Sequence, residues 1–305
     1  MKFYPEGTLT NNPENIRYLR SPEAFREAIE NNITLEARAI MCDNEHNLIV
    51  DLPFGKGIIP RIDGAVGIDD GTTKDIALIS RVNKPVCFKP LCIETDSDGV
   101  ITAILSRKLA QQECLKEYVR NLKNGQIINA KITHFESFGC FVDIGCGLPS
   151  LISIDAISVS RISHPTDRFS NGQEILAVVK SVDGNKVYLS HKELLGTWEE
   201  NASKFQSGQT VSGIVRSVES YGVFVELAPN LAGLAEPFEN VKEGQSASVY
   251  IKAIIPDKMK VKLIIVDVFD DERHARPIEY YINDGVLSRW EYSTQNCTKE
   301  IVTEF

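Results

Sequence analysis

Two short segments of the chain combine aromatic rings with a glycine in the same order. Residues 138–144 read Phe-Gly-Cys-Phe-Val-Asp-Ile and residues 221–227 read Tyr-Gly-Val-Phe-Val-Glu-Leu, 83 positions apart. Rings three residues apart on a regular strand point to opposite faces, but a glycine between them allows a bulge that brings both to one side. Nucleobases stack on exposed rings for about 1–3 kcal/mol each. The spacing allows two aromatic platforms, Phe138 with Phe141 and Tyr221 with Phe224, but taken alone it favours Phe141 and Phe224 in the barrel core with Phe138 and Tyr221 half-buried. The surrounding sequence favours a platform for the first pair and leaves the second pair open.

The sequence around these segments repeats as well. Residues 125–132 match 208–215, residues 148–153 match 231–236, and residues 172–178 match 244–250. About five short strands in a unit of about 70 residues, without long helical crossovers, predict a closed Greek-key barrel of the OB type. Residues 33–108 fit as a worn copy, in which 46–52 align with 138–144 but both aromatic residues are missing.

Stretches of helix-forming residues separate the repeats and divide the chain. We expect an all-β-dominated protein in which tandem five-stranded OB-fold barrels are joined by short helices. The predicted parts are an N-terminal helical segment (1–32), a degenerate barrel (33–108), a linker helix (109–121), a main barrel (122–195), a second linker helix (196–206), a shortened barrel (207–266) and an acidic, aromatic C-terminal segment (267–305). Packing of this last segment on the third barrel is favoured over a role in docking a partner protein.

The net charge of −9 excludes binding of nucleic acid by a bulk positive field. Basic and acidic residues balance within 122–195 and within 205–266, whereas 267–305 is strongly acidic. Seven cysteines without a Cys-x-x-Cys pair indicate reduced, structural thiols. The chain has no long apolar run and does not start like a signal peptide, so we expect a cytoplasmic protein without membrane contact.

Basic residues in the two clear repeats could hold phosphates beside the rings. The candidates are Lys131, Arg161, Lys180 and Lys186 in the second repeat, and Arg216, Lys258, Lys260 and Lys262 in the third. Each of them, taken alone, is more often a solvated surface charge. Asp183-Gly184-Asn185 is strong hairpin chemistry by itself, and His134 lies where it could edge the first platform.

The second repeat resembles the RNA-binding domain of the ribosomal protein S1 family. The resemblance is carried by residues 125–132, by 138–143, by Asp183 with Lys186, and by Leu189-Ser190. It implies an OB fold that binds single-stranded RNA on one barrel face without catalysis, with Asp183 and Lys186 on that face. The family usually has a histidine where this chain has Ser153, Glu236 and Pro60 in its second, third and first repeats, and His164 is a weak candidate to replace it.

Signatures of enzymes are lacking. The sequence contains no Walker loop, no Gly-x-Ser-x-Gly, no His-Glu-x-x-His and no Gly-x-Gly-x-x-Gly, and its histidines show no metal-ligand spacing. We therefore predict no catalytic residue, metal or cofactor. The leading hypothesis is a single-stranded RNA-binding protein of translation or RNA handling, with the ribosome (30S) or another RNA-processing complex as a further partner. The alternative is a protein-interaction scaffold made of degenerate barrels.

Overall fold

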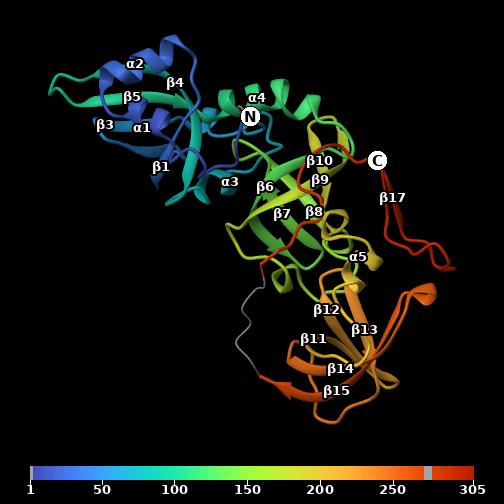
Figure 1. Cartoon of the computed structure of the whole chain (residues 1–305). Helices are drawn as coiled ribbons and strands as arrows, with labels where there is room; N and C mark the ends of the chain where they lie inside the picture. Colours follow the sequence, from blue (N-terminus) through green and yellow to red (C-terminus); the bar gives the residue numbers. More distant parts are fainter. Residues whose placement is uncertain (1–2, 271–276) are drawn as a thin grey trace. The chain divides into compact units, whose positions relative to one another are not determined.

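The computed structural model describes residues 3–270 and 277–305, and its dominant feature in that range is three closed five-stranded barrels (Figure 1). Barrel one consists of β1 (Leu35–Cys42), β2 (Leu48–Leu52), β3 (Gly55–Ile59), β4 (Pro85–Thr95) and β5 (Ile101–Ser106). Barrel two consists of β6 (Ile127–Glu136), β7 (Gly139–Asp143), β8 (Pro149–Ser153), β9 (Glu174–Asp183) and β10 (Lys186–Ser190). Barrel three consists of β11 (Thr210–Glu219), β12 (Gly222–Ala228), β13 (Leu231–Ala235), β14 (Ser246–Ile255) and β15 (Lys260–Phe269).

All three barrels share one strand order. In each, the first strand pairs with the second and the fourth, and the third strand pairs in parallel with the fifth, as β3 does with β5, β8 with β10 and β13 with β15. The remaining pairings given for these barrels are antiparallel, for example β11 with β12 and β14 with β15. The predicted fold class is confirmed, and the worn first repeat is a complete barrel of the same kind.

Short helices precede the barrels, connect them and, in the case of α3, lie between two strands of barrel one. They are α1 (Pro13–Leu19), α2 (Pro22–Glu30), α3 (Ile76–Ile79), α4 (Arg107–Glu117) and α5 (Trp198–Ala202). Ser21 caps α2 by accepting a hydrogen bond from the Ala24 N–H, and a proline follows it at the first position. Ser106 caps α4 in the same way through the Leu109 N–H. Polar capping residues thus fix where α2 begins and where β5 of barrel one is followed by α4.

The chain forms two compact units. The first contains Met1–Leu122 and Asp143–Pro149, and the second contains Lys123–Val142 and Ser150–Phe305. Each barrel buries alternate residues of its strands, as in β15, where Val261, Leu263 and Ile265 face inward and their neighbours are exposed. This alternation decides which side chains reach the barrel surface.

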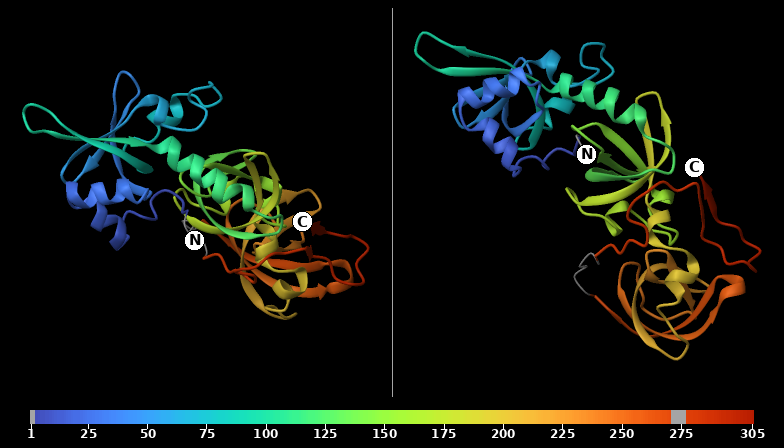
Figure 2. Two further views of the ribbon diagram at one scale, coloured as in Figure 1. Left: turned by 90° about the horizontal axis from the view of Figure 1, so that it is seen from above. Right: turned by 45° about the horizontal axis from the view of Figure 1, so that its top comes forward.

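The C-terminal segment contacts both barrels of the second unit (Figures 1 and 2, red). It includes the short strands β16 (Arg289–Glu291) and β17 (Val302–Glu304), which pair with each other. The Ile127 N–H donates to the Gly285 carbonyl at 3.0 Å, at the edge of barrel two. Trp290 and Tyr292 are buried in the core of barrel three. Residues 271–276 of the predicted C-terminal segment lie outside the described residues.

Candidate nucleic-acid interface

Both aromatic platforms exist and have the same geometry. The ring centroids of Phe138 and Phe141 are 6.3 Å apart at an interplanar angle of 89°, and those of Tyr221 and Phe224 are 6.3 Å apart at 88°. The first ring of each pair is widely exposed, 53% for Phe138 and 63% for Tyr221. The second ring of each pair is half-buried. Each pair therefore presents an open aromatic edge and face to solvent.

The prediction of a bulge at the glycine of the platform is wrong for barrel three. Gly222 pairs regularly with Glu219, and the irregularity lies in the partner strand β11, between Val215 and Ser217. The first ring reaches the same side as the second because it precedes the strand: Tyr221 comes just before β12. Phe138 likewise comes just before β7.

The platform glycine instead allows close approach of two strands. A Cβ atom on Gly139 would lie 2.3 Å from the Ile152 carbonyl oxygen, and one on Gly222 would lie 2.4 Å from the Ala235 carbonyl oxygen. Backbone carbonyls in a barrel cannot move aside, so a side chain does not fit at either position. The equal clash at both positions also shows that β7 and β8 share the register of β12 and β13.

A row of five directly opposed positions crosses each barrel, one on each strand, and we call it the cross-strand row. Its members all point outward from the barrel, because opposed residues on paired strands lie on the same side of the sheet. In barrel three the row is Ser217, Phe224, Leu234, Lys262 and Ala253. In barrel one it is Met41, Ile49, Ile58, Ile104 and Cys92. Barrel one therefore carries an aliphatic row where barrel three carries a ring and a lysine.

Barrel two has the most aromatic row of the three. The His134 ring stacks on Phe141, with centroids 6.4 Å apart and an interplanar angle of 23°. On the other side, Tyr188 lies opposite Leu151 in the parallel pairing of β10 with β8. The Nε2 atom of His134 also lies within hydrogen-bond distance of the Glu136 carboxylate, at 2.9 Å. Tyr188 did not stand out in the sequence, because an exposed tyrosine in a strand has no motif of its own.

Several predicted polar site residues lie near this row. Asp183 and Lys186 are exposed and directly opposite each other at the β9–β10 hairpin, which turns through Gly184 with φ of 59° as predicted. Lys186 and Tyr188 are two residues apart on β10, so they share a face. Ser153 ends β8 and is half-buried.

The other predicted residues lie elsewhere or are engaged in other ways. Lys131 is opposite Glu174, towards the other end of the barrel, and is half-buried. Arg161 is exposed in the loop after β8, and Lys258 is exposed in the turn between β14 and β15. The ring of His164 caps a short turn by accepting from the Thr166 N–H at 3.3 Å, so it serves the local backbone.

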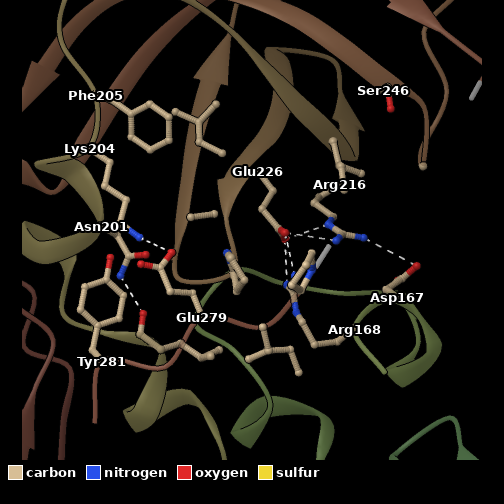
Figure 3. Close-up of a pocket in the computed structure, with 18 of the residues that line it drawn as sticks. Asp167, Arg168, Asn201, Lys204, Phe205, Arg216, Glu226, Ser246, Glu279 and Tyr281 are labelled. Atoms are coloured by element: carbon tan, nitrogen blue, oxygen red, sulfur yellow. Dashed lines mark hydrogen bonds and ion pairs between the residues drawn. The ribbon is translucent and has the colours of Figure 1, made fainter. Parts of the chain in front are cut away.

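Arg216 is buried in an ion network rather than displayed for phosphate (Figure 3). Its Nε donates to Glu226 at 2.8 Å, while Arg168 donates to both Glu226 oxygens at 2.8 and 2.9 Å. The exposed side-chain fractions of Arg216 and Glu226 are only 7% and 4%. Burial raises the pKa of Glu226, but the two guanidinium groups outweigh this and hold the pKa below its usual value.

This network borders a cavity of about 730 Å³ within the second unit (Figure 3). Its charged lining is balanced: Arg168, Arg216 and Lys204 stand against Asp167, Glu226 and Glu279. Arg168 comes from the loop of barrel two, whereas Glu226 is on β12 of barrel three. The balanced charges and the chain positions indicate that the network joins two barrels and does not attract an anion.

Asp143 is the counterpart of Glu226 in the second repeat, and it too is buried. It accepts from the Glu6 N–H at 2.6 Å and from the N–H groups of Gly145 and Gly147 at 2.8 and 3.0 Å. Burial and the nearby Glu6 carboxylate raise the pKa of Asp143 to about 7. The acid of the repeated motif is therefore a structural residue in both copies, which the motif alone does not reveal.

The described residues hold no cluster of three or more histidine, cysteine or acidic side chains arranged to bind a metal ion. None of the helices in the described part of the chain is long and apolar enough to cross a membrane.

Comparison with known proteins agrees with this geometry. The S1 RNA binding domain model matches residues 121–192, the span of barrel two. Bacillus subtilis small ribosomal subunit protein bS1 homolog is 32% identical over 120 residues, covering 37% of this chain and 31% of the relative. Small ribosomal subunit protein bS1 of Staphylococcus aureus is 27% identical over 188 residues, covering 60% of this chain and 45% of the relative. The chain thus spans less than half the length of these relatives.

Solved structures match at lower identity. A multidomain protein with nucleic acid binding domains from Streptococcus pneumoniae is 14% identical, with a TM-score of 0.26, over 77% of this chain and 74% of that one. GSP13 from Bacillus subtilis is 24% identical, with a TM-score of 0.22, over 23% of this chain and 55% of that one. The sequence match carries the relationship: barrel two matches the S1 RNA-binding domain model, and the chain is related to ribosomal protein bS1 at 27–32% identity.

Proposed function

We propose that the chain binds single-stranded RNA, with barrel two as the main site and barrel three as a weaker one. The observation that carries this proposal is the exposed Phe138–Phe141 pair, which lies within the matched S1 domain and has His134 stacked against it. Rings on an open barrel face stack on bases of any sequence. Lys186 and Asp183 border the same face, where one can contact a phosphate and the other a ribose hydroxyl.

Barrel three repeats the ring geometry with Tyr221 and Phe224, and we include Lys258 as a phosphate contact near its edge. Arg216 is left out of the proposed interface because its guanidinium is buried against Glu226. Because the named relatives are ribosomal proteins, a role in translation and contact with the ribosome are part of the proposal, as is a cytoplasmic location. The proposed activity is binding without catalysis.

The test is fluorescence anisotropy with a labelled single-stranded RNA of about 12 nucleotides. The double variant Phe138→Ala/Phe141→Ala should bind at least about tenfold more weakly than wild type, because two stacking rings are lost. Tyr221→Ala/Phe224→Ala should lose less. The control is Phe269→Ala, an exposed ring at the far end of β15, which should bind like wild type.

The rival function is a protein-interaction scaffold, and the aliphatic row of barrel one favours it for that barrel. Met41 in this row is 50% exposed, and no ring accompanies it. The RNA titration also separates the two functions. Absence of wild-type binding at about 50 mM salt would overturn the RNA proposal and favour the scaffold.

A further inference from the structure

The cross-strand row of barrel two contains a second aromatic position that the platform motif does not contain. Tyr188 on β10 is 39% exposed, while its neighbours Val187 and Leu189 are 3% and 1% exposed. The alternation of β10 therefore directs the Tyr188 ring outward. Its partner across the parallel pairing is Leu151, which is half-buried on β8.

Leu151 connects Tyr188 to the ring pair. In barrel three, Phe224 is directly opposite Leu234. Because β7 and β8 share this register, as the glycine clashes show, Phe141 is opposite Leu151. The row of barrel two is therefore His134, Phe141, Leu151, Tyr188 and Ser181.

The length of this row exceeds one nucleotide. Measured along the barrel surface, His134 and Tyr188 are three strand spacings apart, or about 14 Å. On this path the rings of His134 and Phe141 lie on one side of Leu151 and the ring of Tyr188 lies on the other. A single nucleobase covers only part of this distance, so successive bases of one strand can stack on the two sides of Leu151.

The third barrel shows what the row looks like without the second aromatic position. Lys262 occupies the position of Tyr188, and it is exposed opposite Leu234. At the end of β13, where the second repeat has Ser153, the third has Glu236, which pairs with Lys252 at 3.4 Å. Barrel three therefore offers a charge where barrel two offers a ring.

We propose that Tyr188 is a third base-stacking residue of barrel two, so that this barrel holds bases on both sides of Leu151, whereas Lys262 gives barrel three a phosphate contact instead. The inference rests on the proposed RNA binding and adds to it a residue and a difference between the barrels.

Tyr188→Ala should weaken binding of single-stranded RNA about fivefold or more, since one stacked base is lost. Tyr188→Phe, which keeps the ring, should stay within about twofold of wild type. Affinity for a series of oligonucleotides should level off at a shorter length in Tyr188→Ala than in wild type. Tyr250→Ala is the matched control, because Tyr250 is also exposed, at 38%, but lies outside both rows.

Replacing the Tyr188 ring by a charge gives a second test, the salt dependence of RNA binding. Tyr188→Lys should bind with a steeper dependence of log affinity on log salt, by about 0.7, since one more phosphate is neutralised. Tyr188→Ala should leave that slope unchanged. Urea unfolding of each variant separates a lost contact from lost stability, and the midpoints should match that of wild type.

The outcomes distinguish this inference from the function on which it rests. Unchanged affinity in Tyr188→Ala, together with a tenfold loss in Phe138→Ala/Phe141→Ala, would overturn the role of Tyr188 and leave RNA binding in place. Equal losses in Tyr188→Ala and Tyr188→Phe would overturn stacking as the cause. Absence of wild-type binding would overturn both.

Discussion

At the scale of single residues, the repeated motif combines exposed aromatic side chains with buried acidic ones. The rings of Phe138 and Tyr221 are exposed, whereas the acids of the same motif, Asp143 and Glu226, are buried. The rings could be singled out from their type and spacing, although these alone favoured a position in the barrel core. The role of the acids could not, because their partners come from distant parts of the chain: Arg168 is 58 residues before Glu226, and Glu6 is 137 residues before Asp143.

Replacing Glu226 by glutamine should destabilise the protein by about 3 kcal/mol or more, because two buried guanidinium groups lose their charged partner. The lowered pKa of Glu226 means that its contribution is present above pH 4.3, the ordinary value, and is lost as pH falls through the folded-state pKa. Urea unfolding should therefore show a difference between wild type and Glu226→Gln that is largest at neutral pH and narrows below about pH 4.

The matched control is Glu236→Gln, whose carboxylate is 74% exposed in its pair with Lys252. It should change stability by no more than about 0.5 kcal/mol. A difference between wild type and Glu226→Gln that stays constant down to pH 2 would contradict the linkage.

His191 should make the second unit sensitive to acid. Burial lowers the pKa of His191 to about 4, while its Nδ1 keeps a hydrogen bond of 3.0 Å to the Ile157 carbonyl. The unfolded chain binds a proton at His191 near pH 6.5, whereas the folded chain binds it only near pH 4. The free energy of unfolding therefore falls as pH drops from about 7 to 4, and this group contributes about 3 kcal/mol of the loss. The stability deficit of His191→Asn should shrink by that amount over the same range.

Chemical denaturation at pH 7 and at pH 4 measures the effect. Ser137→Ala, an exposed change in the same barrel that removes no titratable group, serves as the control. Parallel profiles of wild type and His191→Asn would show that His191 is not the titrating group.

At the scale of elements, the sequence predicts strands and turns better than it predicts irregularities. The Asp183-Gly184-Asn185 turn and the repeated strands lie where their patterns placed them, since glycine at positive φ and alternating burial are local properties. The bulge was misplaced because the pairing partner decides which strand holds the extra residue, and in barrel three that residue is Arg216. Its bulged position accompanies its burial against Glu226.

Gly139→Ala should disturb barrel two, because the new Cβ would approach the Ile152 carbonyl oxygen to 2.3 Å. We expect a loss of about 1–3 kcal/mol in the free energy of unfolding, since strands β7 and β8 must separate to relieve the contact. Weaker RNA binding should accompany it, because Phe138 and Phe141 flank the shifted backbone. Ser137→Ala, at the exposed neighbouring turn, is the control for both measurements; equal stability of the two variants would contradict the close-approach role of this glycine.

At the scale of the whole molecule, three barrels of one topology have three different surfaces. The C-terminal segment connects barrels two and three, and no repeat in the sequence predicts this connection. Tyr280 accepts a hydrogen bond from the Leu176 N–H of barrel two at 3.0 Å, and Trp290 is buried in the core of barrel three. Because these contacts and the Arg168–Glu226 pair join barrels two and three, we expect the two barrels to unfold as one cooperative unit.

This cooperativity can be measured because both tryptophans of the chain, Trp198 and Trp290, are buried in the core of barrel three. Val179→Ala removes fully buried volume from barrel two alone. If the barrels unfold together, this variant should lower the urea midpoint read by tryptophan fluorescence, although no tryptophan lies in barrel two. Lys186→Ala, an exposed change in the same barrel, should leave the urea midpoint unchanged.

The charged pair between the barrels can be tested in the same way. Adding Arg168→Met and Glu226→Leu should weaken the response to Val179→Ala, since the double change removes the charged connection between the barrels. If the urea midpoint read by tryptophan fluorescence is the same in Val179→Ala as in wild type, barrel three unfolds on its own. The contacts of the C-terminal segment would then hold the barrels together without coupling their stability.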